Sequence, residues 1–172
     1  MPLIRRPLKL FFLNFWRAMT MRVEIGSSIR WKLRSSLRRS GRREIGGVIM
    51  GEQLSPGHFR IVDLTVDNET GGRAHFVRSP ELHSQALHDF FERTGNEYDR
   101  FNYLGEWHSH PRFPVNPSIQ DAGSMFELVH GERQIDFAVL LIVRLDWWWK
   151  LSASCTLFQR GRDAAPAEIQ GV

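Results

Sequence analysis

The 172-residue sequence contains a single cysteine, Cys155, which excludes an internal disulfide framework. Low cysteine content is typical of proteins from reducing compartments, so we expect a cytoplasmic location. Cys155 lies in a run of alternating apolar residues with no histidine nearby in the sequence. This setting favours a thiol buried in the core over a catalytic nucleophile.

A long hydrophobic run is also missing. The apolar stretch at residues 8–16 is interrupted by Lys9 and Asn14, and it is far too short to span a bilayer. It also lacks a small-x-small cleavage site of the kind that follows a secretory signal. We interpret residues 1–20 first as a basic and apolar arm that docks or binds a partner. A mis-assigned start and a membrane-surface helix are the second and third interpretations.

The sequence has neither an internal repeat nor a low-complexity linker. With 42% hydrophobic and 24% charged residues, its length suits one globular domain with a sizeable core. We therefore expect an N-terminal arm over residues 1–20, a folded domain over residues 21–160 and a loose C-terminal tail over residues 161–172.

Acidic residues are nearly absent from the first quarter of the chain. Residues 1–43 contain twelve Lys and Arg but one acid, Glu24, whereas the remaining residues contain eleven basic and eighteen acidic side chains. The basic residues between 30 and 43 are either a solvated helix face or a contact surface for an acidic partner or nucleic acid. Because aromatic interleaving and nucleic-acid motifs are missing, we regard nucleic acid as an unlikely partner.

The hydrophobic pattern predicts strands and helices in a mixed order. A helix capped by Ser27 or Ser28 would place Ile29, Leu33 and Leu37 on one face. We expect further helices at 80–93 and 118–129, the second with Ile119 on its apolar face. Strands are predicted at 45–50, 58–66, 74–77, 102–108, 134–145 and 147–158.

Two of the predicted strands contain unusual runs of residues, a glycine pair and three consecutive tryptophans. The paired glycines Gly46 and Gly47 would permit close approach of backbone or substrate. Trp147, Trp148 and Trp149 would alternate between the two faces of the last strand. At least one of them should then be exposed or cover an interface.

Two histidines separated by one residue, His108 and His110, carry the clearest chemical signal. The period of two along a strand places both side chains on one face, with Ser109 pointing away. Asp121 falls just inside a helix that opens at Ser118 in a capping pattern, so its carboxylate can reach the same point. Two imidazoles and one carboxylate form a tetrahedral zinc site with one position left for water.

This stretch resembles the JAMM (MPN-plus, JAB/Mov34) family of zinc isopeptidases. The resemblance rests on GEWHSHP at residues 105–111 and NPSIQD at residues 116–121. The segment EIGGVIMG at residues 44–51 is similar to the family's glutamate-bearing segment. The match covers most of residues 27–160 in the order of the elements.

The resemblance implies an α+β fold of the MPN/JAMM, cytidine-deaminase-like type, with a central, mostly antiparallel curved sheet flanked by helices. It implies Zn²⁺ as cofactor and hydrolysis of the bond after the C-terminal glycine of a ubiquitin-like modifier. The implied metal ligands are His108, His110 and Asp121, with Glu44 as general acid–base and Ser118 stabilising the oxyanion. Glu106 lies on the same strand face as His108 and His110. It could hold one imidazole in the tautomer that binds the metal, or act as the base itself.

The GEWHSHP sequence resembles the corresponding motif of standalone bacterial peptidases from ubiquitin-like conjugation operons, including operons linked to anti-phage signalling (the CBASS type). E1/E2-like conjugation proteins would then be partners. In chain-specific relatives, insertions contact a second ubiquitin. This chain has little room for them around residues 67–80 or between His110 and Ser118, which argues against strict specificity for one type of ubiquitin linkage. Three alternatives remain: a processing peptidase for a sulfur-carrier protein, a non-catalytic MPN-type binding module, and a nucleic-acid-binding module led by the basic first 43 residues.

Overall fold

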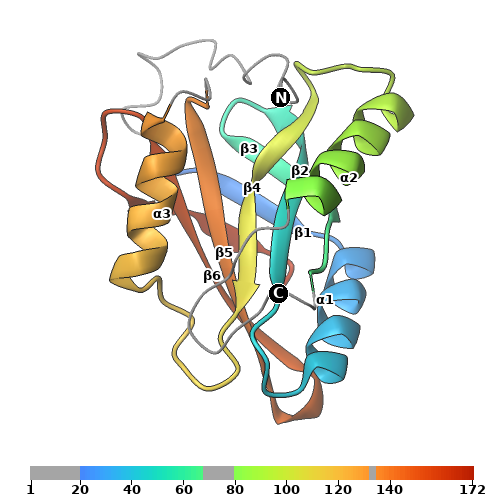
Figure 1. Ribbon diagram of the computed structural model, residues 1–172, viewed down its shortest axis with the longest axis vertical. Coiled ribbons are helices and arrows are strands. Elements are labelled where there is room, and N and C mark those ends of the chain that lie inside the picture. Colours follow the sequence, from blue (N-terminus) through green and yellow to red (C-terminus); the bar gives the residue numbers. More distant parts are fainter. Residues whose placement is uncertain (1–19, 68–79, 132–134) are drawn as a thin grey trace.

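The computed structural model describes residues 20–67, 80–131 and 135–172, and its strands pair into one curved eight-stranded sheet (Figure 1). The strands are β1 (Arg22–Ile25), β2 (Gly46–Ser55), β3 (His58–Leu64), β4 (Phe101–Ser109), β5 (Phe137–Asp146), β6 (Lys150–Gln159), β7 (Ala165–Pro166) and β8 (Glu168–Gln170). The helices are α1 (Ser27–Ser40), α2 (Pro80–Arg93), α3 (Ile119–His130) and the short 3-10 helix η2 (Trp147–Trp149).

The strand order is β7-β6-β5-β4-β2-β3-β1-β8. The β2–β3, β2–β4, β5–β6 and β6–β7 pairs are antiparallel, whereas β4–β5, β1–β3 and β1–β8 are parallel. The expected fold, a mostly antiparallel curved sheet flanked by helices, is confirmed. The expected strand at 74–77 and, apart from its last residue, the expected arm over residues 1–20 lie outside the described residues.

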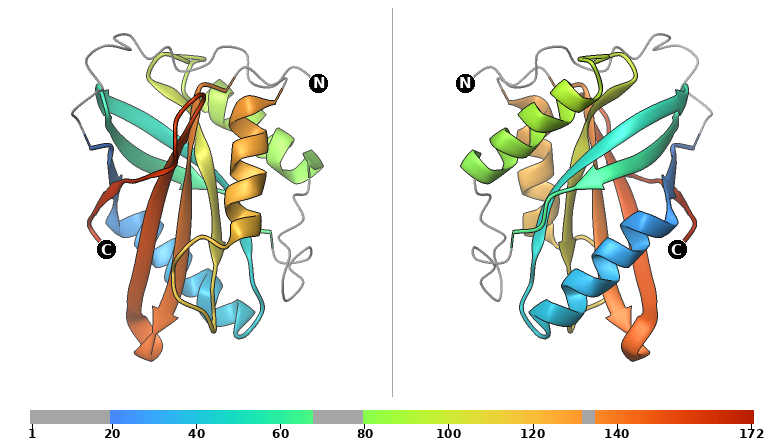
Figure 2. Two further views of the ribbon diagram at one scale, coloured as in Figure 1. Left: turned by 90° about the vertical axis from the view of Figure 1, so that its left-hand side faces the viewer. Right: turned by 90° about the vertical axis from the view of Figure 1, so that its right-hand side faces the viewer.

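The sheet separates two hydrophobic clusters. On one face, α1 contributes Ile29, Leu33 and Leu37, as its sequence period predicts. On the other face, α2 and α3 cover a second cluster, to which α3 contributes Met125, Leu128 and Val129 (Figures 1 and 2). Because β5 is buried on both faces, its sequence is a continuous apolar run rather than an alternating one.

Three expectations about the beginnings of helices and strands are wrong. The residue that caps α1 is Gly26, and Ser27 is already the first helical residue. Ile119, expected on the apolar face of α3, is 95% exposed because it lies on the first turn, beyond the edge of the core. The tryptophans at 147–149 form the η2 turn between β5 and β6 instead of extending β6, and Trp147 and Trp149 are exposed.

A β-bulge in β4 decides which face the later residues of that strand occupy. The pairing with β2 skips Leu104, since Ile49 lies opposite Gly105 and Met50 opposite Tyr103. Gly105 has a φ of +157°, and a Cβ there would lie 2.0 Å from the carbonyl oxygen of Val139. A glycine is therefore required at the bulge, which shifts the alternation that follows it.

The chain after β6 is ordered, so the expectation of a loose tail over residues 161–172 is wrong. Ala167 N–H donates to Cys155 O on β6 (2.9 Å), and Glu168 N–H donates to Met21 O (2.8 Å). β8 then pairs with β1 in parallel. The tail thus connects the two outer parts of the sheet, and Cys155 lies buried beneath it, where burial raises the pKa of its thiol to about 12.

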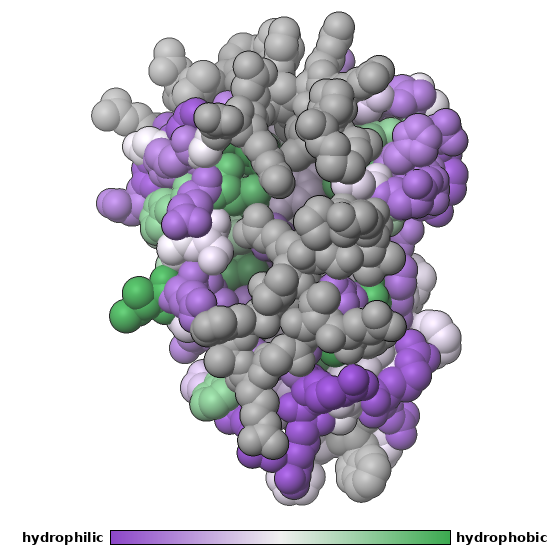
Figure 3. All heavy atoms as spheres, viewed as in Figure 1, coloured by the Kyte–Doolittle hydropathy of each residue, from purple (hydrophilic) through white to green (hydrophobic). Residues whose placement is uncertain are grey.

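Two groups stand out among the basic residues of α1 and of the loop that follows it. Arg30 donates to the carbonyl oxygens of Ile25 and Gly171, and Lys32 forms an ion pair with Asp63. Four arginines at and beyond the end of α1 are exposed: Arg38, Arg39, Arg42 and Arg43. In Figure 3 the surface is hydrophilic at the lower right, where Figure 1 shows the C-terminal end of α1. Among the described residues, no helix combines the length and apolarity that crossing a membrane requires.

Candidate active site

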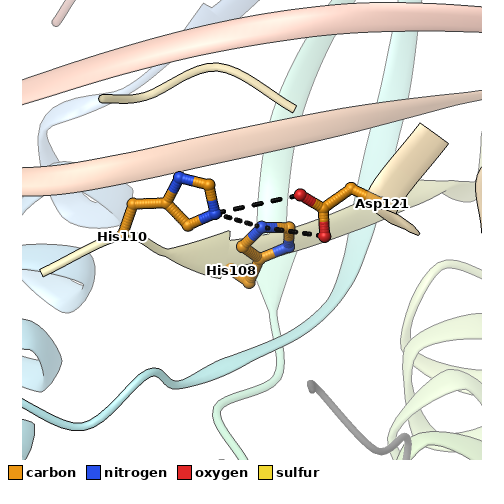
Figure 4. Close-up of side chains that lie close together, drawn as sticks. All are labelled: His108, His110 and Asp121. Atoms are coloured by element: carbon orange, nitrogen blue, oxygen red, sulfur yellow. Dashed lines mark hydrogen bonds and ion pairs between the residues drawn. The ribbon is translucent and has the colours of Figure 1, made fainter. Parts of the chain in front are cut away.

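His108 and His110 project from the end of the central strand β4, on the face that α2 and α3 cover (Figure 4). His108 pairs with Gly46 of β2 and Ile142 of β5. His110 lies just beyond the strand, and its N–H continues the ladder by donating to Val143 O (2.9 Å). The two Nε2 atoms are 3.1 Å apart and both rings are buried, so the predicted placement on one face is confirmed.

Asp121 is held against the histidines by the N-terminus of α3. Ser118 N–H donates to Asp121 Oδ2 (2.7 Å), and Asp121 N–H donates to Ser118 Oγ (3.1 Å), which forms the predicted capping box. Asp121 Oδ1 lies 3.5 Å from His108 Nε2, and Oδ2 lies 3.9 Å from His110 Nε2. The cap therefore orients the carboxylate towards both rings.

The three side chains fit the donor set of a tetrahedral cation. One nitrogen or oxygen from each lies within 4.8 Å of the others. Around an ion with bonds of about 2.0–2.1 Å, tetrahedral ligand atoms are roughly 3.3–3.4 Å apart. The two Nε2 atoms, 3.1 Å apart, and the pair His108 Nε2 and Asp121 Oδ1, 3.5 Å apart, are close to this value. The other carboxylate oxygen, Oδ2, lies 3.9 Å from His110 Nε2. A fourth position would remain for water or substrate.

The tautomer of His110 also suits a metal ligand. Its Nδ1 lies 2.7 Å from the carbonyl oxygen of Pro114. A carbonyl oxygen only accepts, so Nδ1 carries the proton and Nε2 presents a lone pair towards His108 and Asp121. Pro114 lies in the loop of residues 111–117, and its role was not foreseen because a backbone acceptor leaves no signal in the sequence.

Glu44 joins this group although it is far away in the sequence. It lies two residues before β2, whose first residue, Gly46, pairs with His108. Burial raises the pKa of Glu44, and the charge of Asp121 adds to this effect, while His110 and His108 oppose it. The half-buried Glu44 carboxyl therefore lies within electrostatic range of all three candidate ligands.

Ser109 connects the Glu44 segment to the histidine strand. It points to the opposite face, as predicted, and is completely buried. Its Oγ accepts from Ile45 N–H (3.0 Å), and its N–H donates to Ile45 O (2.8 Å). Both hydrogen bonds hold the residue after Glu44 at the end of β4.

Gly47 lies against backbone. A Cβ at this position would be 2.2 Å from the carbonyl oxygen of Thr65, which also accepts from Trp107 Nε1 (2.8 Å). Of the two uses expected for the paired glycines, the structure shows close approach of backbone at Gly47.

Glu106 lies on the same face of β4, two residues before His108. It is buried, and its Oε1 accepts from Tyr103 Oη (3.3 Å). Tyr103 and Glu106 are three residues apart, yet they share a face because the bulge lies between them.

The protein resembles known proteins both in sequence and in fold. Residues 27–152 match the family model described as prokaryotic homologs of the JAB domain. Two curated proteins named CD-NTase/cGAS isopeptidase are similar: one from Vibrio cholerae is 27% identical over 107 residues, and one from Escherichia coli is 30% identical over 108 residues. Each alignment covers 61% of this chain and 65% of the relative, so just under two thirds of each relative is matched.

The fold is shared with a protein of Desulfitobacterium hafniense whose solution structure is known. The two superpose with a TM-score of 0.65 at 19% identity, covering 86% of this chain and 91% of the other. The family match includes Glu44, both histidines and Asp121, and it spans well over half of the sequence. The chain therefore belongs to the prokaryotic JAB domain family, which confirms the resemblance seen in its motifs.

Proposed function

We propose that the protein is a zinc-dependent isopeptidase that hydrolyses the bond after the C-terminal glycine of a ubiquitin-like modifier. The observation that carries this proposal is the convergence of His108 Nε2, His110 Nε2 and the Asp121 carboxylate, with Glu44 in electrostatic range. Nitrogen and carboxylate donors with one open position are typical of catalytic rather than structural zinc.

The roles proposed for the side chains follow from their surroundings. When bound, zinc would lower the pKa of water and polarise the scissile carbonyl. Glu44 would accept the proton of the attacking water and transfer it to the leaving amine. Its raised pKa favours this double role, because an acid–base works best when its pKa is close to the operating pH.

Ser118 would stabilise the oxyanion. Its side chain is exposed, and its Oγ lies beside the Asp121 backbone N–H. The hydroxyl hydrogen can rotate to donate to a developing oxyanion. The capping box holds Ser118 in place before the charge develops, which is the condition for electrostatic preorganisation.

The names of the curated relatives suggest the biological substrate. We propose a conjugate between a ubiquitin-like modifier and an enzyme of the CD-NTase class, formed by E1/E2-like proteins in an anti-phage operon of the CBASS type. The support is the 27% and 30% identity to proteins named CD-NTase/cGAS isopeptidase.

The test is cleavage of a ubiquitin-like protein fused through its C-terminal glycine to a reporter. We expect zinc-loaded protein to release the reporter, and a fusion with that glycine replaced by valine to resist cleavage. The double variant His108→Ala, His110→Ala is the inactive control. No cleavage of the glycine fusion, or equal cleavage of both fusions, would overturn the proposed specificity.

A further inference from the structure

The loop of residues 111–117 determines how His110 is oriented. It begins directly after His110 and ends at Ser118, the cap of α3, so it joins the histidine strand to the helix that carries Asp121. Within it, the Pro114 carbonyl oxygen accepts from His110 Nδ1 (2.7 Å). The position of this one carbonyl therefore sets the direction of the His110 ring.

The loop has few means of holding itself in place. Pro111, Pro114 and Pro117 have no backbone N–H, so the loop has few donors for its own carbonyls. Phe113 and Pro114 are exposed, although the Phe113 ring lies edge-on to His110 and Val115 packs against the cluster that α2 and α3 cover. These apolar contacts do not bind the loop carbonyls, so hydrogen-bond donors from outside the loop add to them in fixing the Pro114 carbonyl.

Arg144 supplies one of these donors. Its Nη1 donates to Phe113 O (2.9 Å), the carbonyl directly before that of Pro114. The other side of the guanidinium is held by Asp146, through Nε to Oδ1 (2.7 Å) and Nη2 to Oδ2 (3.4 Å). This two-point contact fixes the plane of the guanidinium, and Ser152 Oγ in turn donates to Asp146 Oδ2 (2.5 Å).

Ser154 supplies the second donor, from its Oγ to Val115 O. The carbonyls of Phe113, Pro114 and Val115 are thus bound in turn by Arg144, His110 and Ser154. The sheet register explains why the outer donors lie here. Ser154 pairs with Ile142, which pairs with His108, and Ser152 pairs with Arg144. Figure 2 shows the loop beside the β5–β6 hairpin.

We propose that Arg144 and Ser154 are positioning residues that clamp the 111–117 loop so that the Pro114 carbonyl holds His110 ready to bind the metal. The inference rests on the proposed function for the identity of the metal. It assigns a role to the β5–β6 hairpin, which holds the ligand in place without contributing a ligand itself.

The experiment measures zinc affinity by competition with a chromophoric chelator, which requires no substrate. We expect Arg144→Ala and Ser154→Ala each to raise the zinc dissociation constant by roughly 10–100-fold, as loss of support for a ligating histidine does. Arg144→Lys should recover part of the loss, because an ammonium can donate to Phe113 O but cannot form the two-point contact with Asp146. The absorption bands of the cobalt-substituted protein should shift in both alanine variants.

Arg160→Ala is the matched control. Arg160 is exposed, and like Arg144 it donates to a loop carbonyl, Gly131 O (3.4 Å), but at the far end of α3. Its zinc affinity and cobalt spectrum should equal those of the wild type. Thermal unfolding of the zinc-free proteins identifies any variant that fails to fold. If Arg144→Ala fails to fold, the zinc affinity of Ser154→Ala provides the test.

Wild-type zinc affinity and an unchanged cobalt spectrum in a folded Arg144→Ala or Ser154→Ala protein would overturn the clamp and leave the proposed function intact. A wild-type protein that binds no zinc would overturn the proposed function itself. The two failures are therefore distinguishable.

Discussion

Two carboxyl groups approach the histidine pair, and their surroundings shift their pKa values in opposite directions. Burial raises the pKa of Asp121, but the hydrogen bond and charge of His108 and the hydrogen bonds from Ser118 outweigh it and hold that pKa well below its usual range. Burial likewise raises the pKa of Glu44, and there the histidines offset it only in part. A pair of acids separated in this way suits one permanently ionised ligand and one proton carrier.

The first prediction separates Glu44 from Glu106. We expect Glu44→Gln to keep zinc binding and to lower turnover by about 10²–10⁴-fold, because it removes the proton carrier and no ligand. Glu106→Gln should lower zinc affinity by roughly 10–100-fold instead, if the carboxylate supports a ligating imidazole. Turnover is measured with and without added zinc.

Added zinc should restore Glu106→Gln and leave Glu44→Gln inactive. The reverse pattern of rescue would transfer the role of base to Glu106. Glu127→Gln, an exposed change on the outer side of α3, is the control and should behave like the wild type.

The second prediction concerns the metal content. The purified protein should carry about one zinc per chain, since three donors leave one tetrahedral position open. His108→Ala with His110→Ala should reduce this content to background, whereas His130→Ala, an exposed change at the end of α3, should not. Full zinc occupancy of the double variant in elemental analysis would contradict the assignment of the ligands.

Among the elements, α1 and α2 are tied to β3 by one carboxylate. Asp63 Oδ1 lies 2.8 Å from Lys32 Nζ on α1, and Oδ2 lies 3.0 Å from Arg93 Nη2 on α2. Burial raises the pKa of Asp63, but hydrogen bonds from Lys32, Arg93 and the Leu64 N–H outweigh it and hold the pKa below 3.8. Asp63 thus connects helices that lie on opposite faces of the sheet.

The third prediction follows from this bridge. Asp63→Asn should lower the free energy of unfolding at pH 7 by about 1 kcal/mol, since the partners are partly exposed and such pairs contribute little each. Because the pKa is lowered in the folded state, this contribution is present above about pH 4 and is lost as the pH falls through the folded-state pKa.

Urea unfolding at pH 7 and at about pH 3 measures the difference. The difference in free energy of unfolding between the wild type and Asp63→Asn should be smaller at the lower pH. Asp89→Asn is the control, since the Asp89 side chain accepts from Gln85 and its backbone carbonyl accepts from Arg93, both within α2. A gap that stays constant with pH would show that the ionised form of Asp63 is not what stabilises the fold.

At the scale of the whole molecule, the C-terminal segment connects the two outer parts of the sheet. β7 pairs with β6 and β8 pairs with β1, while Ala167 and Ile169 pack against the α1-side cluster. Gly171 follows with a φ of +84°, and its carbonyl oxygen accepts from Arg30. The segment thereby covers backbone groups of both strands that would otherwise be exposed edges.

The fourth prediction is that truncation after Ala164 lowers the melting temperature and increases self-association. The reason is that β1 and β6 each lose a paired neighbour, and unpaired strand edges join other chains. Thermal unfolding and sedimentation velocity are the measurements, with deletion of Val172 alone as the control. A truncated protein that melts and sediments like the full chain would show that the segment contributes nothing to closing the sheet.

Local signals in the sequence were sufficient where the structure depends on neighbours along the chain. The bounds of α2 were predicted correctly, because Pro80 suits a first helical turn and Gly95 and Asn96 adopt the positive φ that ends a helix. The shared face of the two histidines and the capping box of Asp121 were also predicted, since strand period and cap spacing span only a few residues.

The tertiary structure decided what depends on residues that are distant in the sequence. It brought Glu44 into electrostatic range of the histidines through the β2–β4 pairing, bound the loop after His110 to Arg144 and Ser154, and paired β8 with β1. None of these contacts has a local pattern, because each depends on which strands become neighbours and in which register. The sequence alone therefore determined the candidate ligands and, by resemblance, the candidate acid Glu44, and the sheet decided how these residues are held and brought into range of one another.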